Sequence, residues 1–174
     1  MQSHETSTMD SNRILKKTKY LFVLAFMISA STALGIEIGE PAPALKGTLF
    51  SGKHFDLSEQ KGKVVMINFY SSFCKFCAYE IGNIETYVEE NQSRGLVFLA
   101  IGVDDEKDTE RVRGILQTYN LDGLMATDLE ENGFNNSYPT PTTFLVDRSG
   151  TLVFRSKGAK MPSWFRNYVD PLLK

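Results

Sequence analysis

Hydrophobic residues along this chain are grouped in a way that predicts two long buried strands with a helix between them. The segments 63–70 (KVVMINFY) and 95–104 (GLVFLAIGVD) are almost continuously apolar and rich in β-branched residues, which is typical of strands covered on both faces. Over residues 74–91 the apolar positions recur every three or four residues. This spacing predicts a long helix with one buried face.

Shorter elements complete the pattern. A helix is predicted over 107–119, where Asp105 or Asp108 would cap the N-terminus. Hydrophobic runs on either side of Asp147–Gly150 predict a hairpin, whereas 129–142 is predicted to be a loop. Short strands are predicted at 45–49, 53–57 and 123–128. A C-terminal helix is predicted over 161–174, and Pro171 would shorten it. No linker separates these elements, so we predict one domain, an α/β sandwich around a mixed sheet.

The N-terminal segment differs in kind from the rest of the chain. Four basic residues in 13–19 precede the apolar run Tyr20–Ile28, and small residues follow, which is the pattern of a secretory signal. The apolar run is shorter than the roughly 20 residues that span a bilayer. We therefore expect a signal peptide over 1–33 and a folded domain over 34–174 that is periplasmic or otherwise extracytoplasmic. An uncleaved membrane anchor is the alternative.

Composition narrows the classes of partner. The chain has 174 residues, 42% of them apolar, and 19 Lys and Arg against 21 Asp and Glu, for a net charge of −2. No basic surplus points to nucleic acid, and we expect none as a partner. A nucleotide-binding motif is also absent from the sequence. Nothing in the sequence indicates an oligomer, so a monomer is assumed.

The chain has only two cysteines, Cys74 and Cys77, and three interpretations are open. A structural zinc site usually takes four ligands, but the histidines are limited to His4 and His54. A structural clip that closes so short a loop would stabilise little, because the effect grows with loop length. The third interpretation is a redox pair that opens and closes during catalysis.

Their placement favours the redox pair. Cys74 lies where a buried strand ends and a helix begins, so free backbone N–H groups and the helix dipole favour its thiolate. Cys77 follows one helical turn later on the same face. We expect Cys74 to attack a substrate sulfur and Cys77, the more buried of the two, to resolve the mixed disulfide.

Two long motifs carry a family resemblance. The segment 38–80, which ends in SSFCKFCAYE, resembles the opening of extracytoplasmic thioredoxin-like proteins of the TlpA/ResA type, and 139–155 (PTPTTFLVDRSGTLVFR) resembles their later motif. The resemblance implies a thioredoxin-like fold, with a central mixed β-sheet flanked by helices and an N-terminal β-hairpin extension. It also implies that Cys74 is the nucleophile and Cys77 the resolving cysteine of a redox-active disulfide, with no other cofactor or metal.

The same resemblance assigns further residues to the site. Pro141 matches the cis-proline that faces the disulfide, and Thr140 before it could offer a hydroxyl to the Cys74 sulfur. Glu80 matches a glutamate that could move the proton of Cys77; a solvated surface glutamate is the alternative. Phe73 stands where relatives usually have tryptophan. With Phe76 and the 129–142 loop it is expected to form an aromatic rim that binds extended polypeptide.

The expected function is thiol–disulfide exchange with protein cysteines. Reduction is the favoured direction, as in cytochrome c maturation or disulfide repair, and would require a membrane thiol–disulfide electron carrier as partner. A thiol oxidant or isomerase is the alternative, because Lys75 and Thr140 would stabilise the reduced form. A peroxidase is disfavoured because the proline expected of that class is replaced by Ile67, although Ser71 fits its pattern. A metal-delivery module without turnover is the remaining class.

Overall fold

The computed structural model describes residues 36–135 and 137–174. The predicted signal peptide therefore lies outside the described residues. In the described part, no helix combines the length and the apolar character needed to cross a membrane.

A five-stranded mixed sheet forms the centre of the domain. Its central strand, β3 (Val64–Tyr70), is flanked by β4 (Leu96–Gly102), which runs parallel to it, and by β7 (Thr142–Val146), which runs antiparallel. The outer strands are β5 (Gly123–Met125) beside β4 and β8 (Leu152–Lys157) beside β7. The mixed sheet and the β7–β8 hairpin confirm the sequence prediction.

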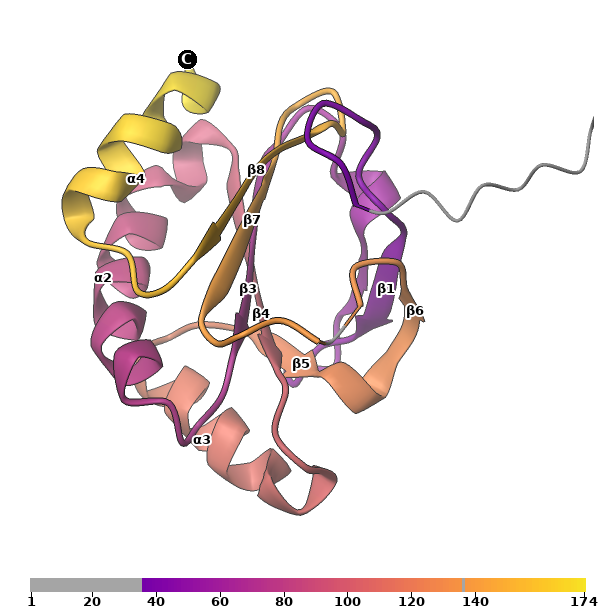
Figure 1. The fold of residues 1–174 in the computed structure, drawn as a ribbon, viewed down its shortest axis with the longest axis vertical. Helices are drawn as coiled ribbons and strands as arrows, with labels where there is room; N and C mark the ends of the chain where they lie inside the picture. Colours follow the sequence, from indigo (N-terminus) through magenta and orange to yellow (C-terminus); the bar gives the residue numbers. More distant parts are fainter. Residues whose placement is uncertain (1–35, 136) are drawn as a thin grey trace, which may run out of the picture. The chain divides into compact units, whose positions relative to one another are not determined.

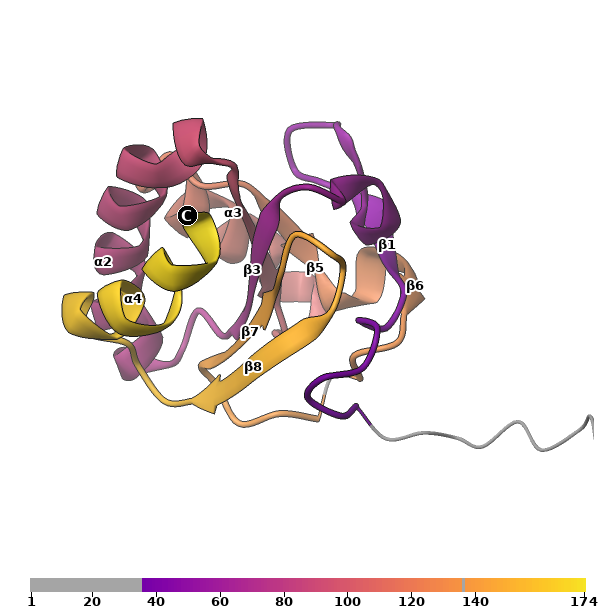
Figure 2. The ribbon, with the colours of Figure 1, turned by 90° about the horizontal axis from the view of Figure 1, so that it is seen from above.

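The two faces of this sheet are covered differently (Figures 1 and 2). Three helices pack on one face: α2 (Lys75–Asn91), α3 (Thr109–Thr118) and α4 (Pro162–Tyr168). On the other face lies a three-stranded sheet of order β2-β1-β6, composed of His54–Asp56, Leu45–Thr48 and Leu129–Asn132. Strands β1 and β2 pair antiparallel, so the predicted N-terminal β-hairpin extension is confirmed.

Strand β3 separates two hydrophobic cores because its side chains alternate. All seven of its residues are buried. Val64, Met66 and Tyr70 pack on the helix side, whereas the intervening apolar residues belong to the core that includes β1 and Phe134. By this alternation Asn68 lies on the helix side. A buried amide needs hydrogen-bond partners, and those of Asn68 connect the sheet to α2.

Three details differ from, or refine, the sequence prediction. Strand β6 falls within the predicted loop 129–142, because its sequence LEEN shows no apolar alternation and its pairing with β1 is made by the backbone. Helix α3 follows a short 3₁₀ turn. Asp108 occupies the N-cap position of α3 and Asp105 that of the turn, as predicted, but neither makes a side-chain cap hydrogen bond. Helix α4 ends at Tyr168, before a 3₁₀ segment that contains Pro171, as expected.

Candidate active site

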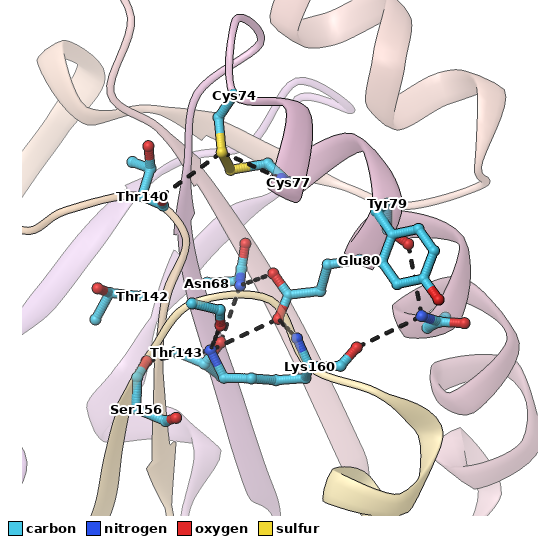
Figure 3. Close-up of polar contacts among 12 residues, drawn as sticks. Asn68, Cys74, Cys77, Tyr79, Glu80, Thr140, Thr142, Thr143, Ser156 and Lys160 are labelled. Atoms are coloured by element: carbon cyan, nitrogen blue, oxygen red, sulfur yellow. Dashed lines mark hydrogen bonds and ion pairs between the residues drawn. A yellow bond between two sulfur atoms is a disulfide. The ribbon is translucent and has the colours of Figure 1, made fainter.

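Cys74 and Cys77 form a disulfide where β3 passes into α2 (Figure 3). Cys74 is the N-cap residue of α2, and its Sγ accepts a hydrogen bond from the backbone N–H of Cys77 over 3.1 Å. Cys74 is half-buried, whereas the side chain of Cys77 is only 4% exposed. A substrate sulfur therefore reaches Cys74 more easily than Cys77.

The loop that carries Cys74 is held by Asp104. This residue follows β4, and its carboxylate accepts hydrogen bonds from the hydroxyls of Ser71 and Ser72 at 3.0 and 2.8 Å and from the backbone N–H of Ser72 at 3.0 Å. Sequence analysis missed this cluster. The carboxyl ends of adjacent parallel strands lie at one edge of the sheet, and that topology was the available signal for it.

The Thr140–Pro141 peptide bond is cis, as the family resemblance implies. Strand β7 begins directly after it and runs antiparallel to β3, with Thr142 opposite Phe69. This register brings the segment to the end of β3 where the cysteines lie. The atom of Thr140 that faces Cys74 Sγ, at 3.6 Å, is its backbone carbonyl oxygen. The expectation that the Thr140 hydroxyl would contact this sulfur is therefore corrected.

Glu80 is buried beneath the disulfide rather than solvated, with 1% of its surface exposed. Its Oε1 accepts a hydrogen bond from the backbone N–H of Lys160 at 3.0 Å, and its Oε2 accepts one from Nδ2 of Asn68 at 3.4 Å. Burial raises the pKa of the Glu80 carboxyl, and the Lys160 ammonium and these hydrogen bonds offset part of the rise. Among the described residues, Glu80 hydrogen-bonds to no sulfur atom.

Lys160, like Asp104, is a residue of this site that sequence analysis missed. It lies between β8 and α4, is 2% exposed, and its Nζ is 3.7 Å from Glu80 Oε1. Nζ also donates to the backbone carbonyls of Ser156, at 3.1 Å, and of Gly158. Burial lowers the pKa of the ammonium and Glu80 opposes that change. Because lysine is rarely buried unless it is paired, a lysine in this position of the sequence is read as exposed, and no local pattern indicated that Lys160 is buried.

Asn68 completes the polar cluster from the sheet side. Its Nδ2 donates to Thr143 Oγ1 on β7 at 3.0 Å as well as to Glu80. One neutral amide thus links β3, β7 and α2 directly below the disulfide (Figure 3).

Exposed aromatic side chains flank the cysteines. Phe73 is 62% exposed and Phe76 71% exposed, and the guanidinium of Arg111 lies 4.8 Å above the Phe73 ring. From the 129–142 loop, Tyr138 instead packs edge-on against Phe144, on the far side of the sheet from the helices. The aromatic part of the predicted rim therefore comes from the C-x-x-C segment itself.

Within residues 36–135 and 137–174, no three His, Cys, Asp or Glu side chains gather in a way that could hold a metal ion.

Comparisons with known proteins agree with this geometry. The sequence model of the AhpC/TSA family matches residues 38–155. Thiol-disulfide oxidoreductase ResA of Bacillus cereus (strain ATCC 10987 / NRS 248) is 28% identical over 174 residues, covering 91% of this chain and 99% of the relative. Thioredoxin-like protein YneN of Bacillus subtilis (strain 168) is 30% identical over 122 residues, covering 68% and 71%.

A solved structure shows the same fold. The crystal structure of a thiol:disulfide interchange protein, a thioredoxin family protein from Chlorobium tepidum TLS, aligns with a TM-score of 0.68 and 27% identity. The alignment covers 80% of this chain and all of the other.

Proposed function

Because this chain belongs to the AhpC/TSA family and is a thioredoxin-like thiol–disulfide oxidoreductase, we propose that it reduces disulfides of proteins outside the cytoplasm through Cys74 and Cys77. The observation that carries the proposal is the division between the two cysteines. Cys74 is accessible and receives an N–H donor on its sulfur, whereas Cys77 is shielded one turn into the helix.

The chemistry proceeds in two exchanges. The Cys74 thiolate attacks one sulfur of the substrate disulfide, so that a Cys74–substrate bond forms and the other substrate sulfur leaves as a thiolate. Cys77 then loses its proton, and its thiolate attacks Cys74 Sγ and releases the second substrate thiolate. The substrate gains two electrons, and the protein is left with the Cys74–Cys77 disulfide.

Three neighbours support these steps. Glu80, one helical turn after Cys77, accepts the proton that Cys77 loses. The backbone at Thr140 and Pro141 lies beside the Cys74 sulfur, and an extended substrate segment binds alongside it. Phe73 and Phe76, which flank Cys74 in sequence, offer exposed apolar surface, which suits a polypeptide better than a small thiol.

The finer assignments extend this proposal. Similarity to ResA proteins favours reduction, with two electrons supplied by a membrane thiol–disulfide carrier and a role such as cytochrome c maturation or disulfide repair. The predicted signal over 1–33 supports an extracytoplasmic location. In the opposite sense, the N–H donor on Cys74 stabilises the reduced form, which makes a disulfide more oxidising. That feature keeps an oxidant or isomerase as the second candidate.

The equilibrium reduction potential of the Cys74–Cys77 pair separates the two candidates. Titration against dithiothreitol or glutathione should give a value near or below that of thioredoxin, about −270 mV, for a reductant. A value close to about −120 mV would reverse the proposed direction. Failure to accelerate insulin reduction by dithiothreitol would argue against catalysis of exchange altogether.

A further inference from the structure

Glu80 and Lys160 come from distant parts of the chain and are enclosed together. Glu80 belongs to α2, and Lys160 lies 80 residues later, between β8 and α4. Both side chains are almost completely buried, with Nζ 3.7 Å from Oε1 (Figure 3). A buried carboxylate or ammonium is strongly unfavourable unless it is paired, so each charge depends on the other.

Lys160 contacts Glu80 in two separable ways. Its backbone N–H donates to Oε1 at 3.0 Å, and any residue except proline would keep that donor. Its ammonium supplies the positive charge and is itself anchored by the carbonyls of Ser156 and Gly158. Substitution of the side chain therefore removes the charge while the backbone hydrogen bond to Glu80 remains available.

No second ionic group shares this environment in the described part of the chain. From β3 and β7 the polar groups beside Glu80 are Asn68 and Thr143, which are neutral. From α4 the ring of Trp164 lies 5.6 Å from Lys160 Nζ. From α2 itself, Cys77 lies one turn before Glu80, and the adjacent Tyr79 is exposed to solvent. Lys160 is thus the cation on which the charge state of Glu80 depends.

We propose that Lys160 is a positioning residue for Glu80: its ammonium keeps the buried carboxylate ionised and ready to take the proton of Cys77. The inference rests on the proposed function, in which Glu80 is the proton acceptor. In the resolving step the Cys77 S–H proton moves to the Glu80 carboxylate, and the Cys77 thiolate then attacks Cys74. Glu80 releases the proton to a departing thiolate or to solvent, and Lys160 keeps its own proton throughout.

The reaction of the reduced protein with dithiobis(nitrobenzoate) separates the relevant steps. Attack by Cys74 releases the first nitrothiolate, and resolution by Cys77 releases the second, so the two absorbance phases report on the two cysteines. The rate of the second phase should fall at acid pH as Glu80 becomes protonated. In Lys160→Met the midpoint of this fall should move up by about 1 to 3 pH units, because a nearby cation lowers the pKa of a carboxyl by that amount.

Matched variants make the result specific. Lys160→Arg should restore a midpoint close to that of the wild type, because it keeps the charge. Lys157→Met, which removes an exposed lysine at the end of β8, should behave as the wild type in both phases. The first phase should keep its pH dependence in all three variants. If Lys160 had only a structural role, its loss would not shift the second-phase midpoint while leaving the first phase unchanged.

Glu80→Gln distinguishes the two levels of the proposal. If it leaves the acid limb of the second phase unchanged, Glu80 is not the proton acceptor and the inference about Lys160 fails with it. If it removes the acid limb while Lys160→Met keeps the wild-type midpoint, Glu80 retains its role and the assignment of Lys160 is overturned.

Wild-type protein provides the measurement if Lys160→Met does not fold. Carbon-13 NMR titration of the reduced protein, with labelled lysine and glutamate, should show Lys160 charged and Glu80 ionised at pH 7. A neutral Lys160 amine at that pH would overturn the proposal.

Discussion

The backbone N–H of Cys77 points at the sulfur of Cys74 over 3.1 Å, and this donor belongs to the first turn of α2. We expect it to stay in place when the disulfide opens, because its position depends on the helix rather than on the S–S bond. An N–H donor and the positive end of the helix favour a thiolate at Cys74. The buried Cys77 receives no comparable donor in the described residues and is suited to the second step.

The order of the two cysteines can be tested by removing each sulfur. Cys74→Ala should reduce the rate of insulin reduction to that of dithiothreitol alone, because no accessible thiolate remains. Cys77→Ala should accumulate a covalent adduct through Cys74, visible on a non-reducing gel. Adducts trapped by Cys74→Ala instead would reverse the assigned order.

The exposed rings beside the disulfide should matter for protein substrates only. Replacement of both Phe73 and Phe76 by alanine should raise the KM for a denatured protein disulfide several-fold, because apolar contact area is lost. The rate with dithiothreitol should be unchanged. Ile38→Ala serves as control. It removes another exposed apolar side chain, next to Gly39, whose N–H bonds to Leu152 at the start of β8. Equal losses with both substrates would show that the rings support the fold instead.

Stability should reveal the mutual dependence of Glu80 and Lys160. Glu80→Gln and Lys160→Met should each lower the free energy of unfolding by about 3–5 kcal/mol, because each leaves one buried charge without its partner. The double variant should lose clearly less than the sum of the single losses. Urea denaturation of the four proteins measures this coupling. Additive losses would mean that the two charges do not stabilise one another.

Asp104 should contribute to both stability and rate because it holds the loop before Cys74. Asp104→Ala removes the acceptor of Ser71 and Ser72 and should cost about 1–3 kcal/mol of unfolding free energy. Exchange should slow as well, while Asp104→Asn should lose less because its amide oxygen still accepts. Asp105→Ala is the control, because its ion pair with Lys107 is exposed and worth little. Equal effects at both positions would contradict the role of Asp104.

Much of this architecture follows from local sequence patterns. Strands β3 and β4 and helix α2 were predictable because their apolar spacing is contained within each segment. Strand β6 was not, because its residues Leu129–Asn132 are held by backbone pairing with β1 and only partly buried. The two redox cysteines were equally local, since their spacing and their position at a strand–helix junction can be read from the chain.

The surroundings of the cysteines depended on long-range contacts. Glu80 was found by its family motif, but its hydrogen-bonding and charged partner is a lysine 80 residues away. The Thr140 segment was found by its motif too, yet only the register of β7 against β3 decides that its carbonyl oxygen faces the sulfur. Side chains that meet through tertiary packing leave no periodic signal in the sequence.

The central position of β3 also governs when the chemistry becomes available. A domain folds as a unit, and the cysteine segment precedes β7, β8 and the lysine that follows them in the chain. Until those residues are present, the pair lacks both the neighbouring Thr140 carbonyl and the buried counter-charge of Lys160. Reactivity therefore matures with the last quarter of the polypeptide, and an incomplete chain has its sulfur atoms but not the environment that directs them.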